Sequence, residues 1–168
     1  MTGKNAARYL ILVMLLLAMA PVAGCGGGGG VTIEVAPLSE GRWGHTATLL
    51  EDGRVLVVGG QQTETPALAT AEIYDPSSKA WSSAGVMAEA HGEGHTATLL
   101  KDGRVLVVGG SSTVEVYDPS AGTWSSTGGM AKGRLWQTAT LLGDGRVLVA
   151  GGQDPTLTRV QEYDSAEV

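Results

Sequence analysis

"DGRVLVVGG" at residues 52–60 recurs letter for letter at 102–110, and returns as "DGRVLVAGG" at 144–152 with one residue changed. Each copy is preceded by a "TATLL" segment. Self-similarity with a spacing of roughly 40 to 50 residues is typical of repeat architectures, and it constrains the fold more than any single motif does. The chain therefore carries three copies of one structural unit.

Each unit is predicted to form β-strands. In the first unit, "HTATLL" at 45–50 and "RVLVVGG" at 54–60 are β-rich runs joined by Asp-Gly, a dipeptide that favours a type I′ hairpin turn. The second run is apolar on both faces, so this strand should be buried on both sides. "AEIYDP" at 71–76 predicts a third strand ended by proline, and the segment around "TWSST" at 123–127 predicts the fourth strand of its unit. Four antiparallel strands per unit form the blade of a β-propeller.

Other positions recur beside these strands. A glycine doublet ends the second strand of each unit, a Tyr follows it, and in two units a Trp comes seven positions after the Tyr. These residues are Gly59, Gly60, Gly109, Gly110, Gly151, Gly152, Tyr74, Tyr117, Tyr163, Trp81 and Trp124. No G-x-x-x-x-G-K-[ST] pattern of a phosphate loop is present. We expect the doublets to be structural, because glycine allows close approach and backbone angles that other residues avoid.

A glycine doublet followed by Tyr and then Trp resembles the kelch repeat, and the resemblance extends over residues 41–168. The Trp-Asp dipeptide of WD40 blades does not occur. The resemblance implies an all-β β-propeller of four-stranded antiparallel kelch blades, with ligands bound by loops at one face or at the mouth of the central channel. We expect blades at about 41–84, 91–127 and 133–168 within a propeller segment that spans 31–168.

About three blades are fewer than the four to eight that usually close a propeller, so the ring is expected to be incomplete. "VTIEV" at 31–35 occupies the place of a fourth strand before the first blade. Two explanations stay open. Either the chain is a truncated piece of a longer propeller, which would expose sheet edges, or two copies form a homodimer that completes a six-bladed ring.

The N-terminus has the features of a secretory signal, which we expect to span 1–24. Lys4 and Arg8 precede an apolar run at 9–20. This run is shorter than the roughly 20 residues that a membrane-spanning helix needs.

"VAGC" at 22–25 resembles the lipobox of bacterial lipoproteins, in which the cysteine carries the lipid. We therefore expect residues 25–30 to be a lipidated Cys25 and a polyglycine tether, which would anchor the module to the membrane. The open alternative is an ordinary secretory signal with an incidental thiol. Gly26 after the cysteine, rather than Asp, favours the outer membrane over the inner one.

The net charge of the chain is -6 at pH 7. Nucleic acid is therefore not expected as a partner, because its recognition requires a basic surface that neutralises phosphates. No cofactor is expected either.

Histidines could indicate a metal site. His45 and His95 share one repeat position, but the third unit has Gln137 there, so we expect packing rather than metal binding. His91 is expected on a solvated loop, with Glu89 and Glu93 nearby, and weak metal binding there is the open alternative.

Repeated charges of opposite sign suggest ion pairs between blades. We expect these pairs to form between the glutamates and the arginines that recur in each unit, which are Glu72, Glu115, Glu162, Arg54, Arg104 and Arg146.

Trp43 and Trp136 lie just before the first strand of their units, where the middle copy has Glu93. Because the repeat does not require an aromatic residue there, we predict that both contact ligand. An exposed indole can stack on a sugar or on a peptide side chain.

The kelch family includes galactose oxidase and sialic acid mutarotases. Galactose oxidase needs a Tyr crosslinked to a Cys at its copper, and the single cysteine of this chain, Cys25, is the expected lipid anchor. We therefore expect a protein- or glycan-binding or scaffolding module of the cell envelope rather than an enzyme. A mutarotase-like activity on carbohydrate is the alternative, and it would need convergent carboxylates or histidines in the channel.

Overall fold

The structure, a computed structural model, describes residues 35–63, 66–156 and 166–167. The described residues form strands and no helices, and none of them belongs to a helix long and apolar enough to cross a bilayer. All the strands belong to one compact unit, Glu34–Val168. The expected signal segment, Cys25 and Tyr163 lie outside the described residues.

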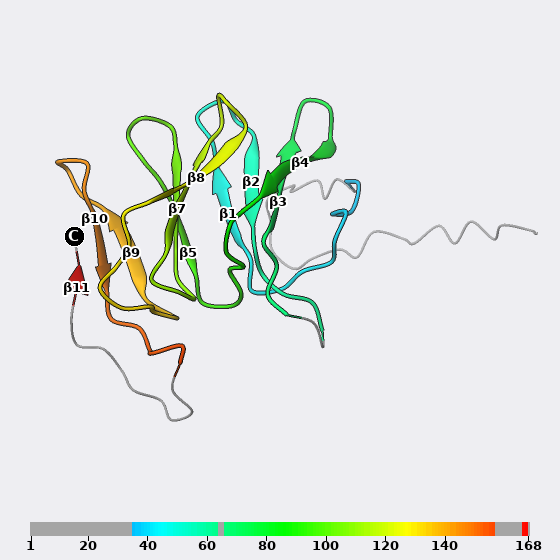
Figure 1. Cartoon of the computed structure of the whole chain (residues 1–168). Coiled ribbons are helices and arrows are strands. Elements are labelled where there is room, and N and C mark those ends of the chain that lie inside the picture. Colours follow the sequence, from blue (N-terminus) through cyan, green and yellow to red (C-terminus); the bar gives the residue numbers. More distant parts are fainter. Residues whose placement is uncertain (1–34, 64–65, 157–165, 168) are drawn as a thin grey trace, which may run out of the picture. The chain divides into compact units, whose positions relative to one another are not determined.

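Within the described residues, three antiparallel sheets lie side by side (Figure 1). Blade 1 consists of β1 (Thr46–Leu49), β2 (Val55–Val58), β3 (Thr70–Asp75) and β4 (Ala80–Val86). Blade 2 consists of β5 (Thr96–Leu99), β6 (Val105–Val108), β7 (Val114–Asp118) and β8 (Thr123–Thr127). Blade 3 consists of β9 (Thr138–Leu141), β10 (Val147–Ala150) and β11 (Ala166–Glu167). The all-β prediction is confirmed, and β1, β5 and β9 are neighbours.

The turn of each β-hairpin differs from the type I′ prediction. In blade 1 the Leu50 N–H donates to the Arg54 carbonyl at 2.8 Å, and the Gly53 N–H donates to the Leu50 carbonyl at 3.0 Å. Of the turn residues only Gly53 has a positive φ, 85°. A type I′ turn needs positive φ at both central residues, so the prediction is wrong. The loop has three residues, a type I turn followed by a left-handed glycine, and Gly103 and Gly145 repeat it.

The aspartate of each hairpin turn binds the arginine two residues further on. Asp52 accepts hydrogen bonds from the Arg54 backbone N–H at 3.0 Å and from its Nε at 2.8 Å. The side-chain hydrogen bond from Arg54 is the main cause that lowers the pKa of Asp52. The same pairs recur in the other blades as Asp102–Arg104 and Asp144–Arg146. The prediction that these arginines pair with glutamates between blades is therefore wrong.

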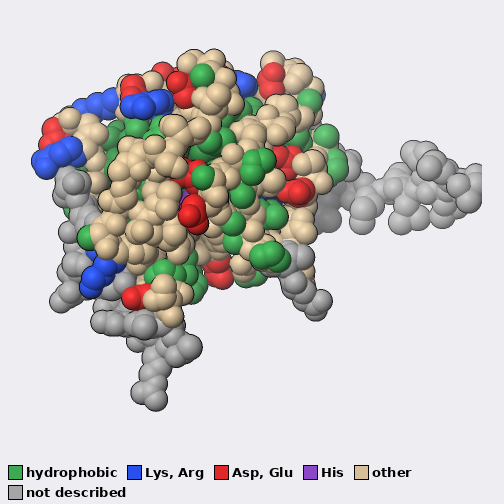
Figure 2. Space-filling model, in the orientation of Figure 1, with side chains coloured by type: hydrophobic (Ala, Val, Ile, Leu, Met, Phe, Trp, Pro, Cys, Tyr) green, Lys and Arg blue, Asp and Glu red, His purple; other side chains and the backbone are tan. Residues whose placement is uncertain are grey.

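Acidic and basic side chains lie next to one another along the upper edge of the view in Figure 2. The turns between the first two strands of the blades lie at this end in Figure 1. The exposed Asp–Arg pairs contribute little to stability, since exposed ion pairs are worth about 0 to 1 kcal/mol.

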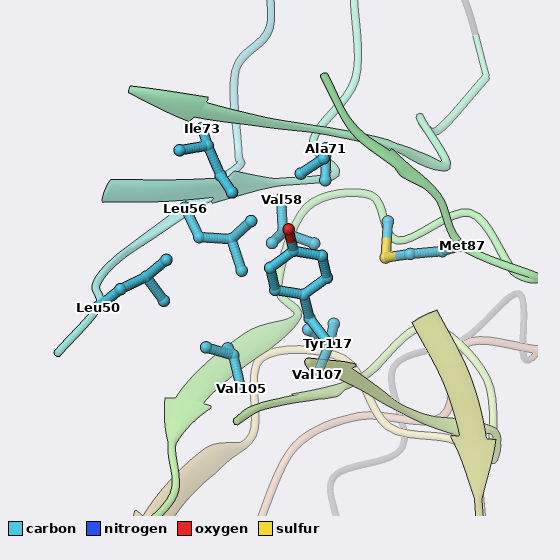
Figure 3. Close-up of a cluster of buried hydrophobic side chains, with 10 residues drawn as sticks. Leu50, Leu56, Val58, Ala71, Ile73, Met87, Val105, Val107 and Tyr117 are labelled. Carbon is cyan, nitrogen blue, oxygen red and sulfur yellow. The ribbon is translucent and has the colours of Figure 1, made fainter. Parts of the chain in front are cut away.

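Apolar side chains from blades 1 and 2 fill the space between these blades (Figure 3). Leu56 and Val58 of β2 are both fully buried there, and they meet Val105 and Val107 of β6 and Tyr117 of β7. Both faces of β6 are buried, as predicted, because Val105 and Val107 pack toward blade 1 while Leu106 and Val108 pack toward blade 3. In β2 Leu56, Val57 and Val58 are also buried, whereas in β10 only Val149 is.

A smaller cluster fills the space between blades 2 and 3. It contains Val108 and Val114 of blade 2 and Val149 of blade 3. A cavity of about 160 Å³ remains beside these side chains, with Met130 also in its lining. Among the residues that the structure describes, the interface between blades 1 and 2 is therefore the more completely packed of the two.

Candidate functional site

The glycine doublets hold the connections that cross from one blade to the next. The Gly60 N–H donates to the His91 carbonyl at 2.8 Å, and the Gly110 N–H donates to the Arg134 carbonyl at 2.7 Å. Gly59 has φ 59°, and a Cβ there would lie 2.3 Å from the His91 carbonyl oxygen. All the doublet glycines have positive φ, including Gly109, Gly151 and Gly152. The doublet thus leaves space for main chain of the next blade.

A basic side chain lies against the first glycine of each doublet. Arg42 Nη1 donates to the Gly59 carbonyl at 2.9 Å, and Arg134 Nη1 donates to the Gly151 carbonyl at 2.7 Å. His91 takes this place in blade 2, with its Nδ1 2.6 Å from the Gly109 carbonyl oxygen. These residues hold one repeat position.

In blade 1 the third-strand glutamate binds this basic residue. Glu72 accepts a hydrogen bond from Arg42 Nη2 at 2.8 Å and from the Ser39 backbone N–H at 2.9 Å. Burial alone would raise the pKa of Glu72, but the hydrogen bonds from Ser39 and Arg42 outweigh it and lower the pKa. We call the basic side chain, the glycine carbonyl and the glutamate a blade triad.

In blade 2 the triad contains His91 and Glu115. The Nε2 of His91 lies 3.1 Å from Glu115 Oε2, and both side chains are buried. Glu115 also accepts hydrogen bonds from the backbone N–H groups of Ala88 at 2.8 Å and Glu89 at 3.2 Å. Glu72 and Glu115 therefore bind the segments that precede the first strands of their blades, whereas Glu162 lies outside the described residues.

The sequence did not reveal the blade triads because their basic residues do not all align from one unit to the next. Arg42 and Arg134 lie three positions before His45 and Gln137, but His91 lies four positions before His95. The expectation of a solvated loop around His91 is wrong, because its exposed fraction is 0%. A basic residue that recurs shortly before each first strand is the signal that could have identified the triads.

The repeat position of His45, His95 and Gln137 packs against the preceding blade where one is described. Gln137 Nε2 donates to the Val108 carbonyl at 2.8 Å, and His95 Nε2 lies 3.0 Å from Thr46 Oγ1. Burial lowers the pKa of His95. Among the described residues no three His, Cys, Asp or Glu side chains are grouped to hold a metal ion.

Trp136 has a strained backbone. Its φ is 56°, and 53% of its surface is exposed. A positive φ is rare for a bulky residue. The equivalent positions in blades 1 and 2 are Gly44 and Gly94, with φ 64° and 84°. Trp136 therefore replaces a glycine of the repeat, and its alignment with Glu93 is wrong by one position.

Trp43 is the residue that aligns with Leu135 and Glu93. Trp43 and Leu135 each form an isolated antiparallel bridge with the glutamine after their doublet, Gln61 and Gln153. Trp43 is 45% exposed and lines a pocket of about 500 Å³.

The two tryptophans and Glu93 lie at the same end of neighbouring inner strands. A Cβ on Gly44 would lie 3.1 Å from Glu93 Cα, and the Trp136 N–H donates to the Gly94 carbonyl at 2.8 Å. The residues before β1, β5 and β9 thus follow one another across three blades. We call the exposed side chains of Trp43, Glu93 and Trp136 the aromatic rim. The repeat alignment places Glu93 at the position of Trp43, but no sequence pattern indicates that a carboxylate belongs to the contact surface.

The repeated tyrosines and tryptophans lie away from this rim and join blades. The ring centroids are 5.1 Å apart in Tyr74–Trp81 and 5.0 Å apart in Tyr117–Trp124. Trp124 Nε1 donates to the Ala84 carbonyl of blade 1 at 2.8 Å. Trp81 makes the same bond, at 2.8 Å, to a carbonyl in the segment before blade 1, that of Ala36.

The fold is that of a kelch-type β-propeller, incomplete over the described residues. Residues 52–87, which include β2, β3 and β4, match the family model of the Kelch motif. The chain is similar to the solved structure described as "Structure of YjhT", with a TM-score of 0.61 and 16% sequence identity. The similarity covers 77% of this chain and 53% of that one, so the chain spans about half of its length. No curated protein sequence matches the chain.

Proposed function

We propose that the protein is a binding or scaffolding module of kelch-propeller type, with the aromatic rim as its contact surface for a protein or glycan. The observation that carries this proposal is the left-handed backbone of Trp136. A strained residue costs of order 1 to 3 kcal/mol and is found most often at functional sites. Glycine would remove the strain, as at Gly44 and Gly94.

The substitution Trp136→Gly separates binding from folding. Because glycine suits a positive φ, we expect the free energy of unfolding to stay the same or to rise by about 1 kcal/mol. Binding to any glycan or envelope protein that the wild-type chain captures should fall at least about tenfold, since an exposed aromatic anchor is lost. A glycan array and a pull-down identify the ligand, and titration calorimetry then measures both variants.

The matched control is Val86→Ala, which removes an exposed apolar side chain of β4 that is 65% exposed and is not part of the rim. It should leave binding unchanged. Equal binding by Trp136→Gly and the wild type would contradict the role of the rim.

A kelch enzyme acting on carbohydrate is the alternative function. Glu93 is the exposed carboxylate of the rim, whereas His91 and His95 are buried and hydrogen-bonded. NMR can follow turnover of a sugar, such as the interconversion of sialic acid anomers. Turnover would favour the enzymatic function over the binding function, and Glu93→Gln should then abolish the activity.

The place of the module in the cell is part of the same proposal. The lipobox-like "VAGC" supports lipidation of Cys25 and anchoring to the bacterial membrane, with the outer membrane favoured. Mass spectrometry of the protein expressed in a bacterium tests it. A chain that is cleaved before Cys25 without added lipid would contradict the anchor.

We propose that a second copy of the chain covers the open side of blade 1. Leu49 is 64% exposed, whereas the equivalent Leu99 and Leu141 of the following blades are partly buried. His45 is exposed, whereas its equivalent His95 is buried against blade 1. The same sequence positions thus form an interface within the chain, and blade 3 of a second copy can repeat this interface.

Light scattering of the purified chain should therefore give twice the chain mass. Leu49→Lys should reduce this mass to that of one chain, because a charge would enter an apolar interface. Val86→Lys, the control on β4, should not. A folded wild-type monomer at high protein concentration would contradict the dimer.

A further inference from the structure

Blade 2 differs from blades 1 and 3 in the basic residue that binds its glycine carbonyl. Arg42 and Arg134 present guanidinium groups, which stay protonated at every pH that a folded protein experiences. His91 presents an imidazole, which can lose its proton near neutral pH. The extra residue Gly92 lengthens the segment before β5, so the shorter ring reaches the same kind of partners.

Both nitrogens of His91 face acceptors. Nδ1 lies 2.6 Å from the Gly109 carbonyl oxygen, and Nε2 lies 3.1 Å from Glu115 Oε2. A neutral imidazole has only one N–H. A neutral ring beside a carboxylate can therefore make only one of these two hydrogen bonds. Both form only if the His91–Glu115 pair holds one additional proton. The backbone N–H groups of Ala88 and Glu89 already donate to Glu115, which favours a carboxylate and an imidazolium.

Among the described residues, the titratable ring that lies next to His91 is His95, whose ring centroid is 5.9 Å away. His95 Nδ1 donates to the Gly92 carbonyl at 2.5 Å, and its Nε2 accepts from the Thr46 hydroxyl at 3.0 Å, so these contacts suit a neutral ring. Burial lowers the pKa of His95, so its contribution to stability is complete above the unfolded pKa and is lost as the pH falls. The pH dependence that His95 contributes therefore has the opposite sign to a loss of stability with rising pH.

We propose that the His91–Glu115 pair makes the connection between blades 1 and 2 sensitive to pH. With its proton in place, the pair ties residues 88–94 to β7 and to the doublet of blade 2, while the His91 carbonyl accepts the Gly60 N–H of blade 1. Loss of the proton leaves a nitrogen lone pair against a buried carboxylate oxygen, and the connection loosens. The stabilisation is complete at low pH and is lost as the pH rises.

Amide hydrogen exchange of the full chain, measured by NMR between pH 6 and pH 8.5, tests the proposal. After correction for the intrinsic effect of pH, protection of the amides of Gly60, Ala88 and Glu89 should fall by about tenfold or more, the scale of one lost charged hydrogen bond. The amide of Ser39 is the internal control, because it donates to Glu72, whose partner is Arg42 rather than a histidine. Its protection should change much less.

The ¹⁵N chemical shifts of the His91 ring report its charge in the same samples. We expect the shifts to change from those of an imidazolium to those of a neutral ring over the same pH range in which protection falls. A ring that is already neutral where the amides are protected, or an equal loss of protection at Ser39 and Ala88, would overturn the proposal. Neither readout depends on ligand binding by the aromatic rim.

Glu115→Gln supplies a second test. The amide of the new side chain can donate to Nε2 while Nδ1 keeps its proton for the Gly109 carbonyl, so a neutral His91 makes both bonds. The pH dependence at Ala88 should then disappear. A pH dependence that persists in this variant would also overturn the proposal.

Discussion

Replacement of Gly59 by alanine should lower the free energy of unfolding by about 2 to 5 kcal/mol. Two costs combine at this position. Its φ of 59° is strained for alanine, and the new Cβ would lie 2.3 Å from the His91 carbonyl oxygen. This carbonyl is main chain and also accepts the Gly60 N–H, so it cannot move away without breaking that bond. Urea unfolding followed by circular dichroism measures the loss.

The matched control is Gly53→Ala in the β1–β2 turn. Gly53 has φ 85°, but a Cβ there would meet nothing within 4 Å. It should cost only the backbone strain, about 1 to 2 kcal/mol. Similar losses at Gly53 and Gly59 would show that the close approach of the next blade contributes nothing.

Tyr117→Ala should be the other strongly destabilising change, with an expected loss of about 3 to 5 kcal/mol in the free energy of unfolding. Tyr117 is 2% exposed and extends between blades 1 and 2 to meet Leu56 and Val58. Removing its ring leaves a cavity between sheets that cannot close without moving a whole blade. The same urea unfolding experiment measures the loss.

Tyr74→Ala is the control, because Tyr74 holds the same repeat position in blade 1. Both tyrosines contact a tryptophan at nearly the same distance, so the loss of the aromatic pair affects both variants equally. Tyr74 is only partly buried, and we expect a smaller loss of roughly 1 to 2 kcal/mol. Equal losses would mean that packing between blades does not stabilise the chain.

The architecture could be predicted because the repeat is long and its apolar pattern is regular. Three copies of one hairpin, each with an apolar second strand, have few arrangements that bury both faces of that strand. The turn type could not be predicted, because Asp-Gly suits two-residue and three-residue loops alike. The register decides between them, since Leu49 pairs with Val55 and leaves Leu50 and Arg54 to close a three-residue loop.

Less of the candidate site than of the fold could be predicted from the sequence. Trp43 and Trp136 are exposed near the inner strands, but their alignment failed because φ, rather than residue type, identifies the position of Trp136. The glutamates could not be assigned to their partners because Arg54 has a carboxylate closer along the chain, that of Asp52. Such local pairs form within a turn, whereas Arg42 and Glu72 meet only after the blade has folded.

The single additional residue Gly92 has a consequence for how these blades can be exchanged. The additional main-chain residue compensates for the shorter side chain. His91 therefore binds the carbonyl of the first doublet glycine in blade 2, as Arg42 does in blade 1. Swapping either feature alone would leave a buried carboxylate out of reach of its cation. Whole connections, such as 88–94 and 131–136, are therefore the interchangeable parts of this protein, and a recombined propeller should be cut at their ends rather than within them.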